Sequence, residues 1–251
     1  MGNTFKKFHR RMNIVFSLCG RGQRFVDAGF KIPKYLIAYN GAPMIYHSVN
    51  TLGINGRIHF IVKSDHLKNY KFLEKLLLTI GDEIIIVDKD TEGAAESILL
   101  AENYIKNKDL PLISANGDQF MNWNGDLFTK QTIWNPDISY IVTFKSQSLG
   151  CSYVRCNEND DIVEVREKKV ISEDATVGIY HWAKTEYFFN DAKKMISDGL
   201  KDNNEYYVAP VYNYTLEHSR VKKYQIPNNE FYPIGTPMEY HTFVRKNKFF
   251  T

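Results

Sequence analysis

Apolar runs and segments of helical spacing alternate through the first half of the chain. Each apolar run has the length of a buried strand. The strand candidates are 14–18, 57–63, 83–87 and 110–114. Apolar side chains at helical spacing predict helices over 44–52, 66–79 and 98–106. This order of strand, helix and strand predicts a largely parallel sheet with helices on both faces.

Shorter β-prone runs separated by turns dominate the second half. The strand candidates there are 138–144, 152–156, 162–166, 175–180 and 221–226. Helices are expected over 185–198, within 204–213 and over 238–245. With 251 residues, the chain is long enough for one large α/β domain.

The amino-acid composition argues against some classes of binding partner. Hydrophobic residues make up 43% of the chain and charged residues 24%, which are ordinary globular values. The net charge of +3 comes from acids and bases mixed throughout, which argues against a dedicated nucleic-acid binder. No apolar run approaches the ~18 residues needed to span a bilayer, so we expect no membrane partner.

The cysteines and the N-terminus bear on the compartment. Cys19, Cys151 and Cys156 form an odd set without regular spacing, which indicates reduced thiols in a cytoplasmic protein. Cys19 closes the first strand, and we expect it to pack rather than react. Residues 1–11 are basic, but the apolar run after them is too short for a secretory signal. We expect these residues to form a loose arm.

A glycine turn, Gly20-Arg21-Gly22, follows the first apolar run. Glycine lets backbone N–H groups approach a phosphate closely, and nearby arginines and lysines add positive charge. The dinucleotide fingerprint G-x-G-x-x-G would need a third glycine where Phe25 stands. The Walker pattern is also absent from the sequence. Phosphate binding is therefore indicated, while NAD or FAD binding is disfavoured.

Two later segments offer ligand contacts. Gly93 and Ala94 stand before a predicted helix, where small residues let a flat ligand lie against the backbone, although they also suit a plain helix start. Asp118 follows the strand over 110–114, at the edge where α/β sheets bind ligands. Its carboxylate suits the Mg²⁺ that accompanies a triphosphate, but Asn-Gly-Asp is equally a simple turn.

The glycine turn extends to G-x-G-x-R-F over 20–25, followed by Pro33-Lys34 and by Gly41-x-Pro43-Met44. This combination resembles the sugar-phosphate nucleotidyltransferases, the nucleoside-diphosphate-sugar pyrophosphorylases. The resemblance implies a Rossmann-like GT-A nucleotidyltransferase fold, with a mixed, mainly parallel central sheet flanked by helices. It implies one domain over 12–251, with a nucleotide-binding part over about 12–125 and an acceptor-binding part over about 126–251.

The resemblance also implies roles for individual residues. The catalytic residues would be Arg24, Lys34 and Asp118, with Asp118 also the Mg²⁺ ligand. Nucleotide contacts would come from Leu18, Gly20, Arg21, Gly22, Gly93, Ala94, Asn116 and Gly117. Acceptor contacts would come from Glu167, Lys168, Gly178 and Glu205.

The implied reaction moves a nucleoside monophosphate from a triphosphate to a small phosphorylated acceptor, with release of pyrophosphate. The run EYYVAPVYN over 205–213 and the closing Gly235-Thr236-Pro237 resemble the capsule-locus branch of the family. That branch includes a cytidylyltransferase that acts on phosphorylated glutamine to make a capsule phosphoramidate. The resemblance favours CTP, with L-glutamine phosphate or a sugar phosphate as acceptor. A homodimer is the default expectation for a soluble enzyme.

One departure from the family pattern leaves alternatives open. Many members have an aspartate two positions before Gly235 as a second metal ligand, and this chain has Pro233 there. Either one carboxylate and the triphosphate hold the Mg²⁺, or another acid such as Glu230 substitutes. A GT-A glycosyltransferase would usually carry Asp-x-Asp, which is missing at Asp118. A non-catalytic nucleotide-binding homologue is the other alternative.

Overall fold

The computed structural model describes residues 12–246. The strands are β1 Asn13–Ser17, β2 Ala38–Tyr39, β3 Ala42–Pro43, β4 Arg57–Lys63, β5 Glu83–Val87, β6 Leu112–Ala115, β7 Gln119–Met121, β8 Ser139–Lys145, β9 Tyr153–Cys156, β10 Ile162–Arg166, β11 Asp174–Trp182, β12 Val221–Gln225 and β13 Phe231–Pro233. The α-helices are α1 Gln23–Asp27, α2 Met44–Leu52, α3 Ser64–Asn69, α4 Leu73–Ile80, α5 Ala94–Leu99, α6 Gly125–Trp134, α7 Thr185–Ser197, α8 Tyr212–Thr215 and α9 Pro237–Lys246. Short 3-10 helices are η2 Lys34–Leu36, η3 Ala209–Val211 and η4 Asn228–Glu230.

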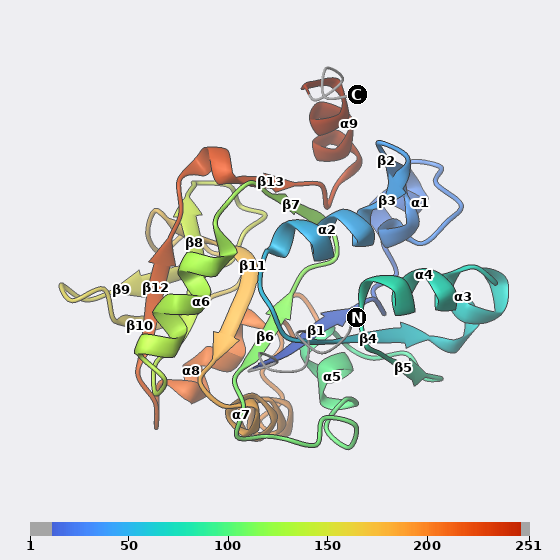
Figure 1. Cartoon of the computed structure of the whole chain (residues 1–251). Helices are drawn as coiled ribbons and strands as arrows, with labels where there is room; N and C mark the ends of the chain where they lie inside the picture. Colours follow the sequence, from blue (N-terminus) through green and yellow to red (C-terminus); the bar gives the residue numbers. More distant parts are fainter. Residues whose placement is uncertain (1–11, 247–251) are drawn as a thin grey trace, which may run out of the picture.

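A mixed sheet runs through the molecule, as the sequence predicts (Figure 1). Its main path is β10-β9-β11-β6-β1-β4-β5, and β8 pairs with both β11 and β12. Within this path, β6, β1, β4 and β5 are adjacent strands that all run parallel to one another. β11 then runs antiparallel to β6 and to β8, so the second half of the chain extends the sheet in mixed directions.

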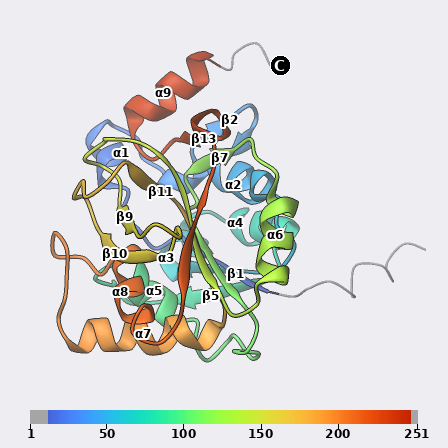
Figure 2. The ribbon, with the colours of Figure 1, turned by 90° about the vertical axis from the view of Figure 1, so that its left-hand side faces the viewer.

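Helices cover both faces of the sheet because neighbouring residues of a strand point to opposite faces. In β1, Val15 lies in a core cluster shared with α5, α7 and α8. Its neighbours Ile14 and Phe16 lie in a second cluster shared with α2, α4 and α6. Figures 1 and 2 show α7 along one end of the molecule and α9 at the opposite end.

Two predicted helices were wrong in their bounds. The segment 66–79 forms α3 and α4, separated at Tyr70, whose hydroxyl donates to the Lys31 carbonyl at 3.3 Å. Tyr70 has φ −120° and ψ 82°, outside the helical region, so the first helix ends there. The helix expected over 98–106 begins earlier and ends at Leu99, after which hydrogen bonds such as Leu100 N to Ser97 O continue as tighter turns.

A small antiparallel pair brings the end of the chain back to the middle. β13 pairs with β7, with Pro233 opposite Gln119. The Ile234 N–H then donates to the Asp118 carbonyl at 3.0 Å. The closing Gly-Thr-Pro segment is therefore held beside the residues that follow β6. Over residues 12–246, no helix is long and apolar enough to cross a bilayer.

Candidate active site

An ion pair joins the glycine-loop region to the end of β6. Lys34 Nζ lies 2.6 Å from Asp118 Oδ2, and the two side chains are 31% and 18% exposed. Lys34 begins η2 after an extended Pro33, and Asp118 lies just beyond β6. The fold therefore brings a cation and a carboxylate, far apart in sequence, to the carboxyl end of parallel strands, where α/β sheets bind ligands.

The glycine loop leaves its cations exposed. Gly22 has φ +62°, and a Cβ there would lie 3.2 Å from Lys34 Cβ, so glycine lets the loop lie against Lys34. At Gly20, a Cβ would find open space within 4 Å. Arg24 is exposed, and Arg21 is 74% exposed and 3.3 Å from Asp90. The loop therefore presents backbone and positive charge toward solvent.

The residues after β6 pack closely against their neighbours. A Cβ on Gly117 would lie 2.9 Å from Leu18 Cδ2, so these two predicted nucleotide contacts adjoin. Gly178 in β11 has φ +83°, and a Cβ there would lie 2.1 Å from Asn116 Nδ2. Gly178 therefore permits a close approach of the Asn116 side chain, and its predicted contact with the acceptor stays a prediction.

The loop before α5 supports the segment around Tyr206. Gly93 has φ +144°, and a Cβ there would lie 2.4 Å from the Tyr206 carbonyl oxygen. Tyr206 N donates to Glu92 O at 2.7 Å, and Ala95 N donates to Tyr206 O at 3.0 Å. Ala94 stays exposed beside them. The predicted base-contacting loop and the segment containing the predicted acceptor residue Glu205 are therefore bonded to each other.

A compact polar cluster follows β10. The Ser152 hydroxyl donates to Glu167, and Lys168 Nζ donates to the Tyr207 hydroxyl and lies 4.3 Å from that ring's centroid. Lys168 adopts φ +50°, a conformation that non-glycine residues rarely take. Burial raises the pKa of Glu167, and the Glu205 carboxylate adds to this effect. Sequence reasoning missed Tyr207.

Tyr207 links the two halves of the site. Burial raises the pKa of Tyr207, and the neighbouring Glu205 raises it further, while the positive charge of Arg24 opposes both. Arg24 is thus close enough to act on a residue that contacts Lys168. The sequence shows Tyr207 only as part of the Glu-Tyr-Tyr run of 205–207, and the spacing of that run does not predict a contact with Lys168.

The closing segment surrounds Asp118 from another side. A Cβ on Gly235 would lie 2.7 Å from Asp118 Oδ2 and 3.8 Å from Glu239 Oε2. Pro233 is exposed, and Glu230 belongs to η4 at the far end of β13. Sequence reasoning missed Glu239, whose closeness to Asp118 depends on the β13–β7 pairing.

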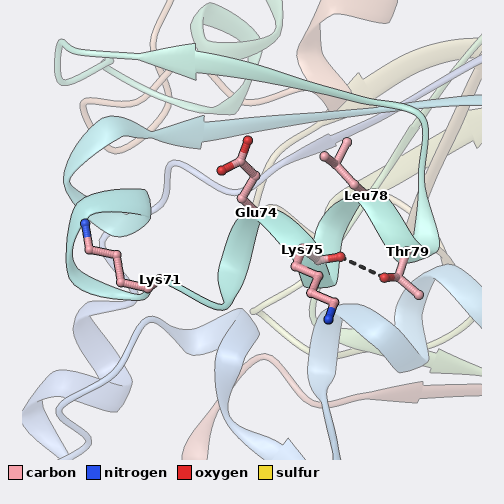
Figure 3. A pocket seen from close by; sticks show the side chains of 5 residues that line it. All are labelled: Lys71, Glu74, Lys75, Leu78 and Thr79. Atoms are coloured by element: carbon pink, nitrogen blue, oxygen red, sulfur yellow. Dashed lines mark hydrogen bonds between the residues drawn. The ribbon is translucent and has the colours of Figure 1, made fainter.

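Two other features lie apart from this cluster. A shallow depression of about 410 Å³ is lined by α4 and the turn before it, from Lys71 to Thr79 (Figure 3). Its lining includes none of the predicted site residues. Cys19 is buried, and burial raises its thiol pKa to about 11, so the expected packing role is confirmed and a thiolate at neutral pH is disfavoured.

A protein-family model and a known protein both match this chain. The family model described as "Nucleotidyl transferase" matches residues 15–246. The bifunctional protein GlmU of Methanococcus aeolicus is 25% identical over 170 residues, which cover 62% of this chain and 36% of that protein. The matched region thus spans about a third of that relative's length.

Solved structures share the fold. A nucleoside-diphosphate-sugar pyrophosphorylase from Vibrio cholerae superposes with a TM-score of 0.81 at 23% identity, covering 92% of this chain and 99% of that one. The inositol-1-phosphate CTP transferase from T. maritima superposes with a TM-score of 0.72 at 17% identity, covering 95% and 96%. The Rossmann-like fold expected from the sequence is therefore confirmed.

Proposed function

The chain belongs to the nucleotidyl transferase family, and from that premise we propose that it transfers CMP from CTP to a small phosphorylated acceptor with release of pyrophosphate. The observation that supports this most directly is the Lys34–Asp118 pair beside the glycine loop. A lysine, a carboxylate and free backbone suit a metal-bound triphosphate better than an uncharged ligand.

In the proposed reaction, an oxygen of the acceptor phosphate forms a bond to the α-phosphorus of the triphosphate. The bond from that phosphorus to the oxygen bridging to the β-phosphate breaks, and its electron pair leaves with pyrophosphate. No covalent enzyme intermediate is required. Catalysis is then positioning and charge neutralisation. Arg24 and the loop amides would hold the leaving pyrophosphate, and Lys34 would bridge toward the attacking phosphate.

The donor set fits Mg²⁺. In residues 12–246, no group of three or more His, Cys, Asp or Glu side chains is arranged to hold a metal by itself. Mg²⁺ is commonly held by one or two carboxylates together with substrate phosphates and water, so Asp118 suits it as a ligand. When bound, Mg²⁺ would offset the negative charge of the triphosphate.

The polar cluster after β10 suits a small phosphorylated acceptor. Lys168 offers a cation for a phosphate, and Glu167 and Glu205 offer acceptors for amine or hydroxyl groups. L-glutamine phosphate and sugar phosphates both have these groups. We favour CTP and L-glutamine phosphate because of the resemblance over 205–213, and a role in capsule biosynthesis rests on the same resemblance.

The test is a pyrophosphate-release assay with Mg²⁺. CTP, UTP, dTTP, ATP and GTP are each paired with L-glutamine phosphate, glucose 1-phosphate and inositol 1-phosphate. We expect release with CTP and one acceptor, together with formation of the matching CDP-linked product. Release with another nucleotide alone would overturn the base assignment. A folded protein that binds a nucleotide but releases no pyrophosphate with any pair would overturn the proposed reaction.

A further inference from the structure

We infer that Glu239, in the first turn of α9, is the second carboxylate that holds the triphosphate's metal ion, facing Asp118 across Gly235. The inference rests on the proposed function, because it needs a metal-bound triphosphate. It answers the question that Pro233 raises, since a proline side chain cannot ligate a metal.

Gly235 lets two carboxylates approach its backbone closely. A methyl group there would lie 2.7 Å from Asp118 Oδ2 and 3.8 Å from Glu239 Oε2. The first distance is too short for any side chain other than hydrogen, and the two distances place carboxylate oxygens from two elements on the same side of this glycine. Oxygen ligands of this kind are the ones Mg²⁺ prefers, at about 2.1 Å from the ion.

The position of Glu239 is fixed by the start of its helix. Thr236 Oγ1 donates to Glu239 Oε2 at 2.9 Å, and Glu239 N donates to Thr236 Oγ1 at 3.2 Å. α9 is itself anchored, because Ile234 and Phe243 are buried against Phe25 of α1. The Glu239 carboxylate is thus held by the same cluster that supports the helix after the glycine loop.

Glu230 lies too far along the strand to take this role. Its carbonyl accepts from Asn122 N at 2.8 Å, whereas Asp118 bonds to Ile234. Asn122 is four residues beyond Asp118, which in an extended chain is about 13 Å. Glu230 therefore sits at the opposite end of the β13–β7 pair from Gly235.

Charge around the cluster also favours a cation. The Asp118 and Glu239 carboxylates would each repel the phosphates of a triphosphate. A divalent cation between them would offset this repulsion.

The test measures metal binding without turnover. Mn²⁺ affinity is determined by electron paramagnetic resonance in the presence of α,β-methylene-CTP, for the wild-type protein, Glu239→Gln and Glu230→Gln. Glutamine keeps the size of the side chain and an oxygen for the Thr236 hydroxyl, so α9 should stay capped. We expect Glu239→Gln to weaken Mn²⁺ binding at least 10-fold, and Glu230→Gln to change it less than 2-fold.

A second variant separates ligation from general charge. Thr236→Val removes the hydroxyl that holds Glu239, and we expect a smaller loss of Mn²⁺ affinity than in Glu239→Gln. Equal Mn²⁺ affinity in the wild type and Glu239→Gln would overturn this inference and leave the proposed function standing. A wild-type protein that binds neither Mn²⁺ nor the CTP analogue would overturn the proposed function itself. A loss in Glu230→Gln that matches Glu239→Gln would also overturn the assignment.

Discussion

The predicted nucleotide side and the predicted acceptor side of the site are built differently. The nucleotide side consists of glycine backbone and exposed cations, such as Arg21 and Arg24. The acceptor side consists of polar side chains already bonded to one another, with Lys168 on Tyr207 and Glu167 on Ser152. Backbone amides and exposed charge suit a group that every triphosphate shares, whereas a cluster of side chains bonded to one another suits one particular molecule. Discrimination among substrates should therefore be sharper on the acceptor side.

The strongest way to test this division is Lys34→Ala, which removes the cation that would serve both substrates in the proposed reaction. We expect kcat to fall by about 10²–10³, as on loss of a preorganised charged donor. Pyrophosphate release measures kcat, and circular dichroism checks the fold. Lys31→Ala, an exposed lysine of the same loop, is the matched control. Near-normal turnover in Lys34→Ala would remove Lys34 from the mechanism.

Two glycine substitutions test whether the close contact between β11 and the Asn116 side chain matters. Gly178→Ala combines φ +83° with a Cβ 2.1 Å from Asn116, whereas Gly29→Ala has φ +88° and open space. A strained backbone position costs about 1–3 kcal/mol, so both variants should lose some free energy of unfolding in urea. Only Gly178→Ala should lose more than this and also lose CTP affinity. Equal losses in the two variants would show that the Asn116 contact is unimportant.

Tyr207→Phe tests whether the acceptor cluster is preorganised. It removes the hydroxyl that contacts Lys168 and keeps the ring beneath the ammonium. A net hydrogen bond of about 1 kcal/mol corresponds to a roughly five-fold higher KM for the acceptor. KM for CTP should stay within two-fold. Tyr104→Phe, on an exposed ring, is the control. An equal rise in both KM values would contradict the division between the two sides.

The smallest expected effect is a pH dependence from Glu167. Burial raises its pKa above the ordinary value of 4.5, so the folded protein binds this proton more tightly than the unfolded chain does. Its contribution to stability is complete below about pH 4.5 and is lost as pH rises through the folded pKa. Urea unfolding from pH 4 to 8 should therefore show Glu167→Gln gaining stability relative to wild type as pH rises. A difference that is flat with pH would contradict the raised pKa.

Helices, strands and motifs that depend on neighbouring residues are the features that the sequence predicts best. The bounds of α2, β4, β5 and β10 follow directly from apolar spacing, since each element is regular and packs one or both faces in the core. The glycine loop and Asp118 stand out for the same reason, as short motifs beside a strand. Their pairing as Lys34–Asp118 joins residues far apart in the chain, and family resemblance had indicated that they act together.

The contacts that the sequence did not predict are those between segments far apart in the chain. Tyr207 reaches Lys168 only because the segment after α7 returns to the Gly93 loop. Glu239 reaches Asp118 only through the pairing of β13 with β7. The division of 66–79 into two helices accompanies a contact between Tyr70 and Lys31, which are 39 residues apart in the chain. Periodicity contains no information about such contacts.

The backbone bonds between the Gly93 loop and Tyr206 have a thermodynamic consequence. A nucleotide base that shifted or ordered this loop would shift or order the 205–207 segment with it, because the two share hydrogen bonds in both directions. Binding free energies linked in this way are reciprocal: if CTP tightens acceptor binding, the acceptor tightens CTP binding by the same factor. The loop contact would then make each substrate an effector of the other.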